Sequence, residues 1–427
     1  MNNDIKIITF GCRLNIFESE IIKKRIENAN ISDVVVLHTC AITAEAERQA
    51  KQQYRKIVKE NPTAKIIITG CSAQNSVDYY KKQSNILAIL GNREKLIQKY
   101  YDEIAKDLSK APFVFVGEVL KNPPALIEIK SKDELFKFDG KTKAFVQIQQ
   151  GCNNRCSFCI VPFTRGKNQS FSEQSILNQC KGFIKKGYKE IILTGVDISA
   201  YGSDTKDKSL FSIVKKILDS FPTLKRLRLS SLDPAKSYDQ IIGLMKLDNR
   251  LMPHFHLSIQ AGDNKVLKDM RRRHNRDDII TLCKKIHKAN KNAAIGADII
   301  VGFPDESDEE FKNTYKLVKK CKITHLHVFT YSIREGTKAA TMKNQIPEHI
   351  KKERSLKLRT LGEKLKYKFI KSQRRKIHTI LVEKDNKGYT ENYISVNILG
   401  EKIKPNTIVK AKIVKVEKDC TAFAKMV

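Results

Sequence analysis

The stretch that decides the fold is Phe145-Val-Gln-Ile-Gln-Gln-Gly-Cys152-Asn-Asn-Arg-Cys156-Ser-Phe-Cys159-Ile-Val-Pro162-Phe-Thr-Arg165-Gly166. Its alternating, β-branched opening predicts a strand, and Gly151 predicts a turn after it. Three cysteines then follow with the spacing Cys-x3-Cys-x2-Cys. Thiols placed this closely after a strand can converge on one point, and such thiolates hold zinc or iron–sulfur centres.

The number of thiols separates these two kinds of metal centre. A structural zinc site takes four protein ligands, and the sequence near the loop supplies no fourth cysteine or histidine. A cluster of four irons held by three cysteines leaves one iron free to bind a ligand. We therefore expect a catalytic iron–sulfur site in this loop.

Composition narrows the class of protein further. The 427 residues suffice for two or three domains, and 80 basic against 47 acidic residues give a formal charge of +33. This excess indicates a polyanionic partner such as nucleic acid, although a lysine-rich genome would also raise the charge. No secretory signal or long apolar run is present, so we expect a soluble, cytoplasmic protein without a membrane partner. Ten cysteines in a reducing compartment favour metal or redox chemistry over disulfides.

Residues 1–110 alternate short apolar runs with helical patterns, which predicts a parallel α/β sheet. Cys12, Cys40 and Cys71 each follow the carboxyl end of a predicted strand. Because these ends share one edge of a parallel sheet, the three thiols should meet there. A second three-cysteine cluster is our hypothesis, and three small buried residues in tight turns are the alternative.

Residues 144–345 repeat the strand–helix pattern six times. The predicted strands are Phe145–Gln149, Glu190–Thr194, Arg226–Ser230, His254–Ile259, Ala293–Val301 and His325–Tyr331. The pattern favours a partial (β/α)6 barrel, and periodicity alone leaves an open doubly wound sheet as the alternative. Lys265–Ala289 is expected to form one helix between two of these strands. Polar residues and glycines gather at the strand ends, where barrel enzymes keep their functional groups, although each could also simply build a turn.

The remaining segments connect or follow these two domains. We expect a proline-containing linker at 111–143 and a basic connecting helix at 346–370. Residues 371–427 predict a small all-β barrel of four strands, related in style to oligonucleotide-binding barrels. Four cysteines outside both triplets are expected to be small buried residues: Cys180, Cys283, Cys321 and Cys420.

The Cys152 loop after a first barrel strand resembles the radical S-adenosylmethionine superfamily. Together with Cys12, Cys40, Cys71 and the terminal β domain, the resemblance narrows to the methylthiotransferases and covers nearly the whole chain. It implies two 4Fe–4S clusters: one on Cys152, Cys156 and Cys159 that binds S-adenosylmethionine, and an auxiliary one on Cys12, Cys40 and Cys71 that carries the sulfur to be transferred.

The same resemblance implies further partners and site residues. The last domain resembles the RNA-binding TRAM domain of the family, and a low-potential electron donor of the flavodoxin or ferredoxin type would supply the electron to a monomeric enzyme. By analogy, six residues would contact S-adenosylmethionine: Phe158, Gly195, Asp197, Ser230, Gln260 and Asp298.

The segment Gly11-Cys12-Arg13-Leu14-Asn15 resembles the branch that acts on N6-threonylcarbamoyladenosine beside the tRNA anticodon. The branch acting on N6-isopentenyladenosine usually reads Gln-Met-Asn after its first cysteine, and the branch modifying a ribosomal-protein aspartate reads Pro-Lys-Asn. These two substrates are the alternatives, and a zinc-bearing, non-catalytic RNA-binding protein is an alternative from another class. Departures from the family pattern, none at a cysteine, are His38, Ile333, Glu335 and Lys338.

Overall fold

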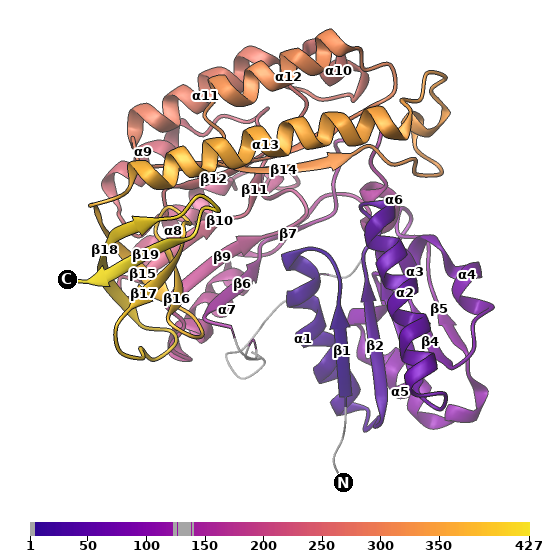
Figure 1. The fold of residues 1–427 in the computed structure, drawn as a ribbon. Coiled ribbons are helices and arrows are strands. Elements are labelled where there is room, and N and C mark those ends of the chain that lie inside the picture. Colours follow the sequence, from indigo (N-terminus) through magenta and orange to yellow (C-terminus); the bar gives the residue numbers. More distant parts are fainter. Residues whose placement is uncertain (1–4, 123–125, 127–137, 139–140) are drawn as a thin grey trace.

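The protein is described by a computed structural model that covers residues 5–122, 126, 138 and 141–427. Figure 1 shows an N-terminal α/β sheet beside a larger half-barrel, with a small β barrel packed at the other end of the half-barrel. The long helix α13 (Glu348–Ser372) runs along the half-barrel and leads into the small barrel. In the described part of the chain, no helix has both the length and the apolar character needed to cross a membrane.

The N-terminal sheet contains five parallel strands in chain order. They are β1 (Ile5–Thr9), β2 (Val34–Thr39), β3 (Lys65–Gly70), β4 (Ile86–Leu90) and β5 (Phe113–Phe115). Its helices are α1 (Arg13–Asn28), α2 (Ala44–Glu60), α3 (Cys71–Asn75), α4 (Val77–Lys81) and α5 (Gln98–Lys106), with short 3-10 turns at Glu94–Leu96 and Leu108–Lys110. Strand β5 lies inside the segment expected as a linker, so the sheet continues past residue 110.

The central domain is a partial barrel of parallel strands, as the sequence predicts. Two sheets compose it, and an isolated bridge pairs Leu227 of the first sheet with Leu251, which lies three residues before a strand of the second. The first contains β6 (Lys143–Gln147), β9 (Glu190–Thr194) and β10 (Arg226–Leu229), and the second contains β11 (Ser231–Leu232), β12 (His254–Gln260), β13 (Ala294–Val301) and β14 (His325–Thr330). Because the strand order follows the chain without reversal, the alternative of a doubly wound sheet is wrong.

The helices between these strands are α7 (Glu173–Lys185), α8 (Leu210–Ser220), α9 (Asp239–Leu247), α10 (Asn264–Asp269), α11 (Arg276–Ala289) and α12 (Asp308–Lys320). The expected single helix Lys265–Ala289 is wrong, because Met270–Asn275 separates α10 from α11. Asn275 caps α11: its side chain accepts hydrogen bonds from the backbone N–H groups of Asp277 and Asp278. The interrupting loop places Arg272 against Cys156 and His274 against Asp233.

The C-terminal domain is a closed barrel with strand order β15-β16-β17-β19-β18. The strands are β15 (Ile377–Val382), β16 (Lys387–Thr390), β17 (Ser395–Leu399), β18 (Ile408–Val416) and β19 (Ala422–Met426). The C-terminal domain therefore contains five strands, where the sequence predicted four. The additional strand β16 contains Gly388, and glycine is more typical of a turn than of a strand, so the sequence did not predict this strand.

A buried ion cluster joins the small barrel to the half-barrel. Glu190 on β9 pairs with Arg228 at 2.8 Å and with Arg226 at 3.3 Å, and all three side chains are buried. Arg226 also donates to the backbone oxygens of Thr379 at 2.6 Å and Tyr389 at 2.9 Å in the small barrel. Burial alone would raise the pKa of Glu190, but the charges of Arg228 and Arg226 lower it to about 2.

Glu190→Gln should destabilise the protein, because it leaves two buried guanidinium groups without a counter-charge. We expect a loss of about 3 kcal/mol in the free energy of unfolding at pH 7, measured by urea denaturation. At pH 3.5 the difference from wild type should narrow by ~1 kcal/mol, because the stabilisation from Glu190 is present above its unfolded pKa and fades as the pH falls toward 2.

Asp219→Asn is the matched control. Asp219 forms an ion pair with Lys215, and both side chains are more than half exposed. It should change stability by less than about 0.5 kcal/mol. Equal stability of the two variants would contradict this account of the domain junction.

Candidate active site

The three-cysteine loop follows β7 (Gln149–Gln150) and ends at α6 (Val161–Arg165). Its base is closed by β8 (Gln169–Ser170), which pairs with β7, and by a hydrogen bond of 3.0 Å from the Cys152 N–H to the Gly166 oxygen. Gly151 has a φ of +71°, and a Cβ there would lie 1.9 Å from the Lys167 oxygen, so only glycine fits. The three cysteines therefore share one tightly closed loop.

The sulfur atoms of this loop accept hydrogen bonds of the kind that support metal-bound thiolates. The donors are Asn154 N to Cys152 Sγ at 3.5 Å, Val161 N to Cys159 Sγ at 3.4 Å, and Arg272 Nη1 to Cys156 Sγ at 3.4 Å. Burial raises the pKa of Cys152 and of Cys159 to about 12, so both thiols need a metal to ionise at neutral pH. Three free thiols with donors aimed at their sulfurs fit an iron–sulfur cluster.

Two carboxylates lie beside the loop. Asn154 Nδ2 donates to Asp197 at 3.0 Å and to Asp233 at 3.3 Å, and Arg272 donates to Asp233 at 2.9 Å. Burial and then the neighbouring charge of Asp233 raise the pKa of Asp197. Burial would raise the pKa of Asp233, but His274, whose Nδ1 lies 3.5 Å away, and the charge of Arg272 outweigh burial and lower it. This carboxylate pair next to the thiols suits a ligand that carries an amine.

The other residues expected to contact S-adenosylmethionine lie in different surroundings. Gly195 lies against Gln149, where a Cβ would come within 2.8 Å of the Gln149 oxygen, and Asp197 follows it at the loop. Ser230 is buried at the end of β10, Gln260 ends β12 with a φ of +70°, and Phe158 packs edge-on against Phe303.

Asp298 is positioned differently from these residues. It lies within β13, and its Oδ1 pairs with His256 at 3.0 Å and with His327 at 3.1 Å. The structure therefore brings Asp197 to the cysteine loop and gives Asp298 two histidine partners instead.

The second triplet lies at the carboxyl edge of the N-terminal sheet. Cys12 caps α1 after β1, Cys40 follows β2, and Cys71 opens α3 after β3. A Cβ on Gly11 would lie 2.8 Å from Cys40 Sγ, and burial followed by the charges of Cys71 and Cys12 raises the pKa of Cys40 to about 12. The three thiols are thus close enough to influence one another.

The two cysteine regions lie against each other. Ile160, which directly follows Cys159, forms a small buried cluster with Ala41 and Cys71. Asn92 Nδ2 donates to the Thr164 oxygen at 2.7 Å and to Cys71 Sγ at 3.6 Å. In Figure 1, α6 accordingly lies at the top of the N-terminal domain, next to α2 and α3.

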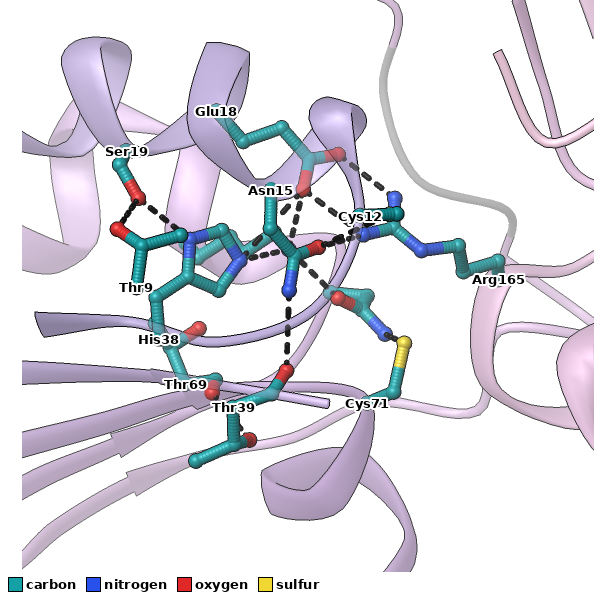
Figure 2. Close-up of polar contacts among 12 residues, drawn as sticks. Thr9, Cys12, Asn15, Glu18, Ser19, His38, Thr39, Thr69, Cys71 and Arg165 are labelled. Carbon is teal, nitrogen blue, oxygen red and sulfur yellow. Dashed lines mark hydrogen bonds and ion pairs between the residues drawn. The ribbon is translucent and has the colours of Figure 1, made fainter. Parts of the chain in front are cut away.

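A buried polar network crosses this contact, as Figure 2 shows. Glu18 on α1 accepts hydrogen bonds from Arg165 Nη1 at 2.8 Å and from Lys95 Nζ at 2.7 Å. Lys95 also donates to Asn92 Oδ1 at 2.7 Å and lies 3.0 Å from His38 Nε2, so its three N–H groups have three acceptors. A charged Lys95 and a neutral His38 satisfy these contacts. Burial followed by the charge of Lys95 holds the pKa of His38 well below its usual value, and burial also lowers the pKa of Lys95, against the opposing charge of Glu18.

In this network the carboxylate of Glu18 faces two cations, Arg165 and Lys95. The network therefore carries one more positive than negative charge. Burial raises the pKa of Cys71, but the charges of Arg165 and Lys95 outweigh it and set its pKa below the ordinary value. The network therefore favours a thiolate at Cys71, which suits a metal cluster.

Sequence reasoning missed Arg165, Lys95 and Arg272 as functional residues. Charged residues at such positions usually form a solvated face, and no spacing rule marks these three as buried. The four remaining cysteines behave as small residues: Cys180, Cys283 and Cys321 are buried, and Cys420 is half-buried.

Comparison with known proteins agrees with this site. Residues 146–318 match the Radical SAM superfamily, and residues 4–91 match the Uncharacterized protein family UPF0004. The fold resembles the radical S-adenosylmethionine methyltransferase TsrM from Kitasatospora setae, with a TM-score of 0.56 and 14% identity over 77% of this chain and 70% of that chain. Fold and cysteine loop thus define a radical S-adenosylmethionine enzyme.

Two relatives refine this class. The threonylcarbamoyladenosine tRNA methylthiotransferase MtaB of Rickettsia prowazekii (strain Madrid E) is 42% identical over 98% of this chain and 97% of its own. The tRNA-2-methylthio-N(6)-dimethylallyladenosine synthase of Bacillus subtilis (strain 168) is 31% identical over 95% of this chain and 82% of its own. The chain belongs to the radical S-adenosylmethionine methylthiotransferases, whose cofactors are an iron–sulfur cluster and S-adenosylmethionine. Membership in an enzyme family decides against the non-catalytic zinc-bearing alternative.

The buried network predicts an order of stability among three variants. Glu18→Gln leaves two buried cations without a counter-charge and should cost about 3 kcal/mol or more of unfolding free energy. Arg165→Met still leaves Lys95 paired with Glu18 and should cost only about 1–2 kcal/mol. Glu27→Gln, at an exposed position of the same helix, should be nearly neutral. Urea denaturation measures all three, and a greater loss for Arg165→Met than for Glu18→Gln would refute this charge count.

Proposed function

We propose that this enzyme adds a methylthio group to N6-threonylcarbamoyladenosine beside the tRNA anticodon and uses two 4Fe–4S clusters. The observation that carries the proposal is the contact between two separate cysteine triplets, through Ile160 and Cys71. Cys152, Cys156 and Cys159 would hold the cluster that binds S-adenosylmethionine. Cys12, Cys40 and Cys71 would hold the auxiliary cluster, where the sulfur to be transferred is bound.

The bound cofactors supply a 5′-deoxyadenosyl radical, which is needed because an aromatic C–H bond has no acidic proton for acid–base chemistry. The residues of the chain itself would bind these cofactors and orient them. Asp197 and Asp233 suit the amine of S-adenosylmethionine, and Arg272 holds Asp233 and Cys156 in place. Gly195, Ser230, Gln260 and Phe158 complete the proposed cofactor site, and a flavodoxin- or ferredoxin-type protein would supply the electron to the monomeric enzyme.

Several features support tRNA as the substrate. The relative at 42% identity is named for threonylcarbamoyladenosine in tRNA, and Gly11-Cys12-Arg13-Leu14-Asn15 resembles the same branch. The formal charge of +33 suits a polyanion. The small barrel presents a set of exposed lysines that can contact phosphates: Lys402, Lys404, Lys410, Lys412, Lys415 and Lys418.

Nucleoside mass spectrometry of tRNA tests the substrate. In cells that lack this protein, the methylthio derivative of threonylcarbamoyladenosine should disappear, and re-expression should restore it. Loss of methylthio-isopentenyladenosine instead, with the first nucleoside unchanged, would retain the chemistry but reject the substrate.

A single substitution tests the division of labour between the triplets. Cys12→Ala should keep reductive cleavage of S-adenosylmethionine, because the Cys152 loop is intact, and should lose methylthio transfer. Chromatography of 5′-deoxyadenosine and of the modified nucleoside measures the two activities. Cys156→Ala is the comparison and should lose both. Our assignment would be wrong if Cys12→Ala abolished cofactor cleavage.

A further inference from the structure

An aromatic surface lies on the inner face of the half-barrel. Phe255 and Leu257 belong to the hydrophobic core, so His254 on the same strand points to the opposite face. There the ring of His254 lies 5.6 Å from His325 on β14 and 4.7 Å from Tyr393 of the small barrel. Two domains together thus build one surface of flat rings.

Tyr393 is held in this surface by an unusual backbone. Its φ is +68°, a left-handed conformation that a bulky side chain rarely adopts. The conformation occurs in the turn between β16 and β17, and it places Tyr393 between its stacked neighbour Tyr389, at 4.9 Å, and His254. Strained backbone of this kind persists only where surrounding contacts hold it, and it is common at functional sites.

The rings are uncharged at neutral pH. Burial, followed by the charge of Arg228, holds the pKa of His254 well below its usual value. Burial, followed by the charge of Lys366, lowers the pKa of His325 to about 4. His254 itself is buried, so the half-buried rings of His325 and Tyr393 are the ones that a flat, neutral group such as a nucleobase can reach.

Arg13 stands at the edge of this surface. It directly follows Cys12, and its Nη2 lies 3.4 Å from the Tyr393 hydroxyl, which accepts a hydrogen bond from it. This contact places the guanidinium beside Tyr393, whose ring lies 4.7 Å from that of His254. Arg13 is half-buried, and within the described residues it forms no ion pair.

Several buried cations near the two triplets and the rings, unlike Arg13, have counter-charges. Arg228 pairs with Glu190, Arg165 with Glu18, and Lys143 with Glu383 at 2.9 Å. The planar guanidinium of an arginine can donate two parallel hydrogen bonds to one carboxylate. In Arg13 this capacity is unused, because no carboxylate of the described residues pairs with it. The missing partner is one that a ligand can bring.

We propose that Arg13 binds the free carboxylate of the threonylcarbamoyl group and thereby selects the substrate. The inference rests on the proposed function, since that substituent ends in an amino-acid carboxylate, whereas the isopentenyl group is an uncharged hydrocarbon. Arg13 adjoins Cys12, so the carboxylate would be bound next to the place of sulfur transfer.

The test pairs a variant with a change in the substrate. Two anticodon stem-loop RNAs are prepared that differ only in the threonyl carboxylate, which is free in one and a methyl ester in the other. The kcat/KM for methylthiolation of each RNA is measured with the reconstituted enzyme and dithionite. Wild type should prefer the free acid by about 10- to 100-fold. Arg13→Gln should reduce this preference to less than about 3-fold, mainly through a loss on the acid, and Arg13→Lys should retain part of it.

Controls separate the possible failures. Arg55→Gln, at an exposed position of α2, should keep the wild-type preference for the acid. An unchanged acid-to-ester ratio in Arg13→Gln, or an equal loss on both RNAs as expected for a phosphate contact, would overturn the inference. If wild type modifies neither RNA but modifies one carrying isopentenyladenosine, the proposed function has failed instead.

Discussion

One buried carboxylate, Glu18, holds the two halves of the candidate site together. It lies on the helix that Cys12 caps, and it pairs at 2.8 Å with Arg165, at the end of the helix that follows the Cys152 loop. Both side chains are almost fully buried, and in the protein interior a charge without a counter-charge lowers the free energy of unfolding strongly. Lys95 adds a second cation to the same carboxylate. Any displacement of one domain against the other would therefore break a buried ion pair.

This constraint explains how two cysteine triplets far apart in sequence come to share one region. The N-terminal sheet and the half-barrel each present the carboxyl ends of parallel strands, which is where α/β proteins bind ligands. Ile160 against Cys71 brings these edges into contact, and the small barrel brings Tyr393 onto the inner face of the half-barrel. In the function that we propose, both cysteine triplets, the aromatic surface and Arg13 would thus belong to one composite site.

The sequence predicted most of what is local. Cysteine spacing and strand periodicity were readable because each depends on neighbouring residues, whereas periodicity left the strand order of the central domain open until the structure showed it. The charged residues at the domain contact were not readable: Glu18, Lys95 and Arg165 look like solvated charges until the domains meet. The loop that interrupts Lys265–Ala289 and positions Arg272 was missed for a related reason, since helical periodicity continued through it. Strand β16 was missed because its glycine also signals a turn.

The measurement that tests the central claim most directly is the count of iron and labile sulfide per chain. It is made after anaerobic reconstitution, in wild type and in the triple variant Cys12→Ala, Cys40→Ala, Cys71→Ala. Two separate clusters predict about eight irons and eight sulfides in wild type and about four of each in the variant. Equal iron in both proteins, or zinc without sulfide, would contradict the account.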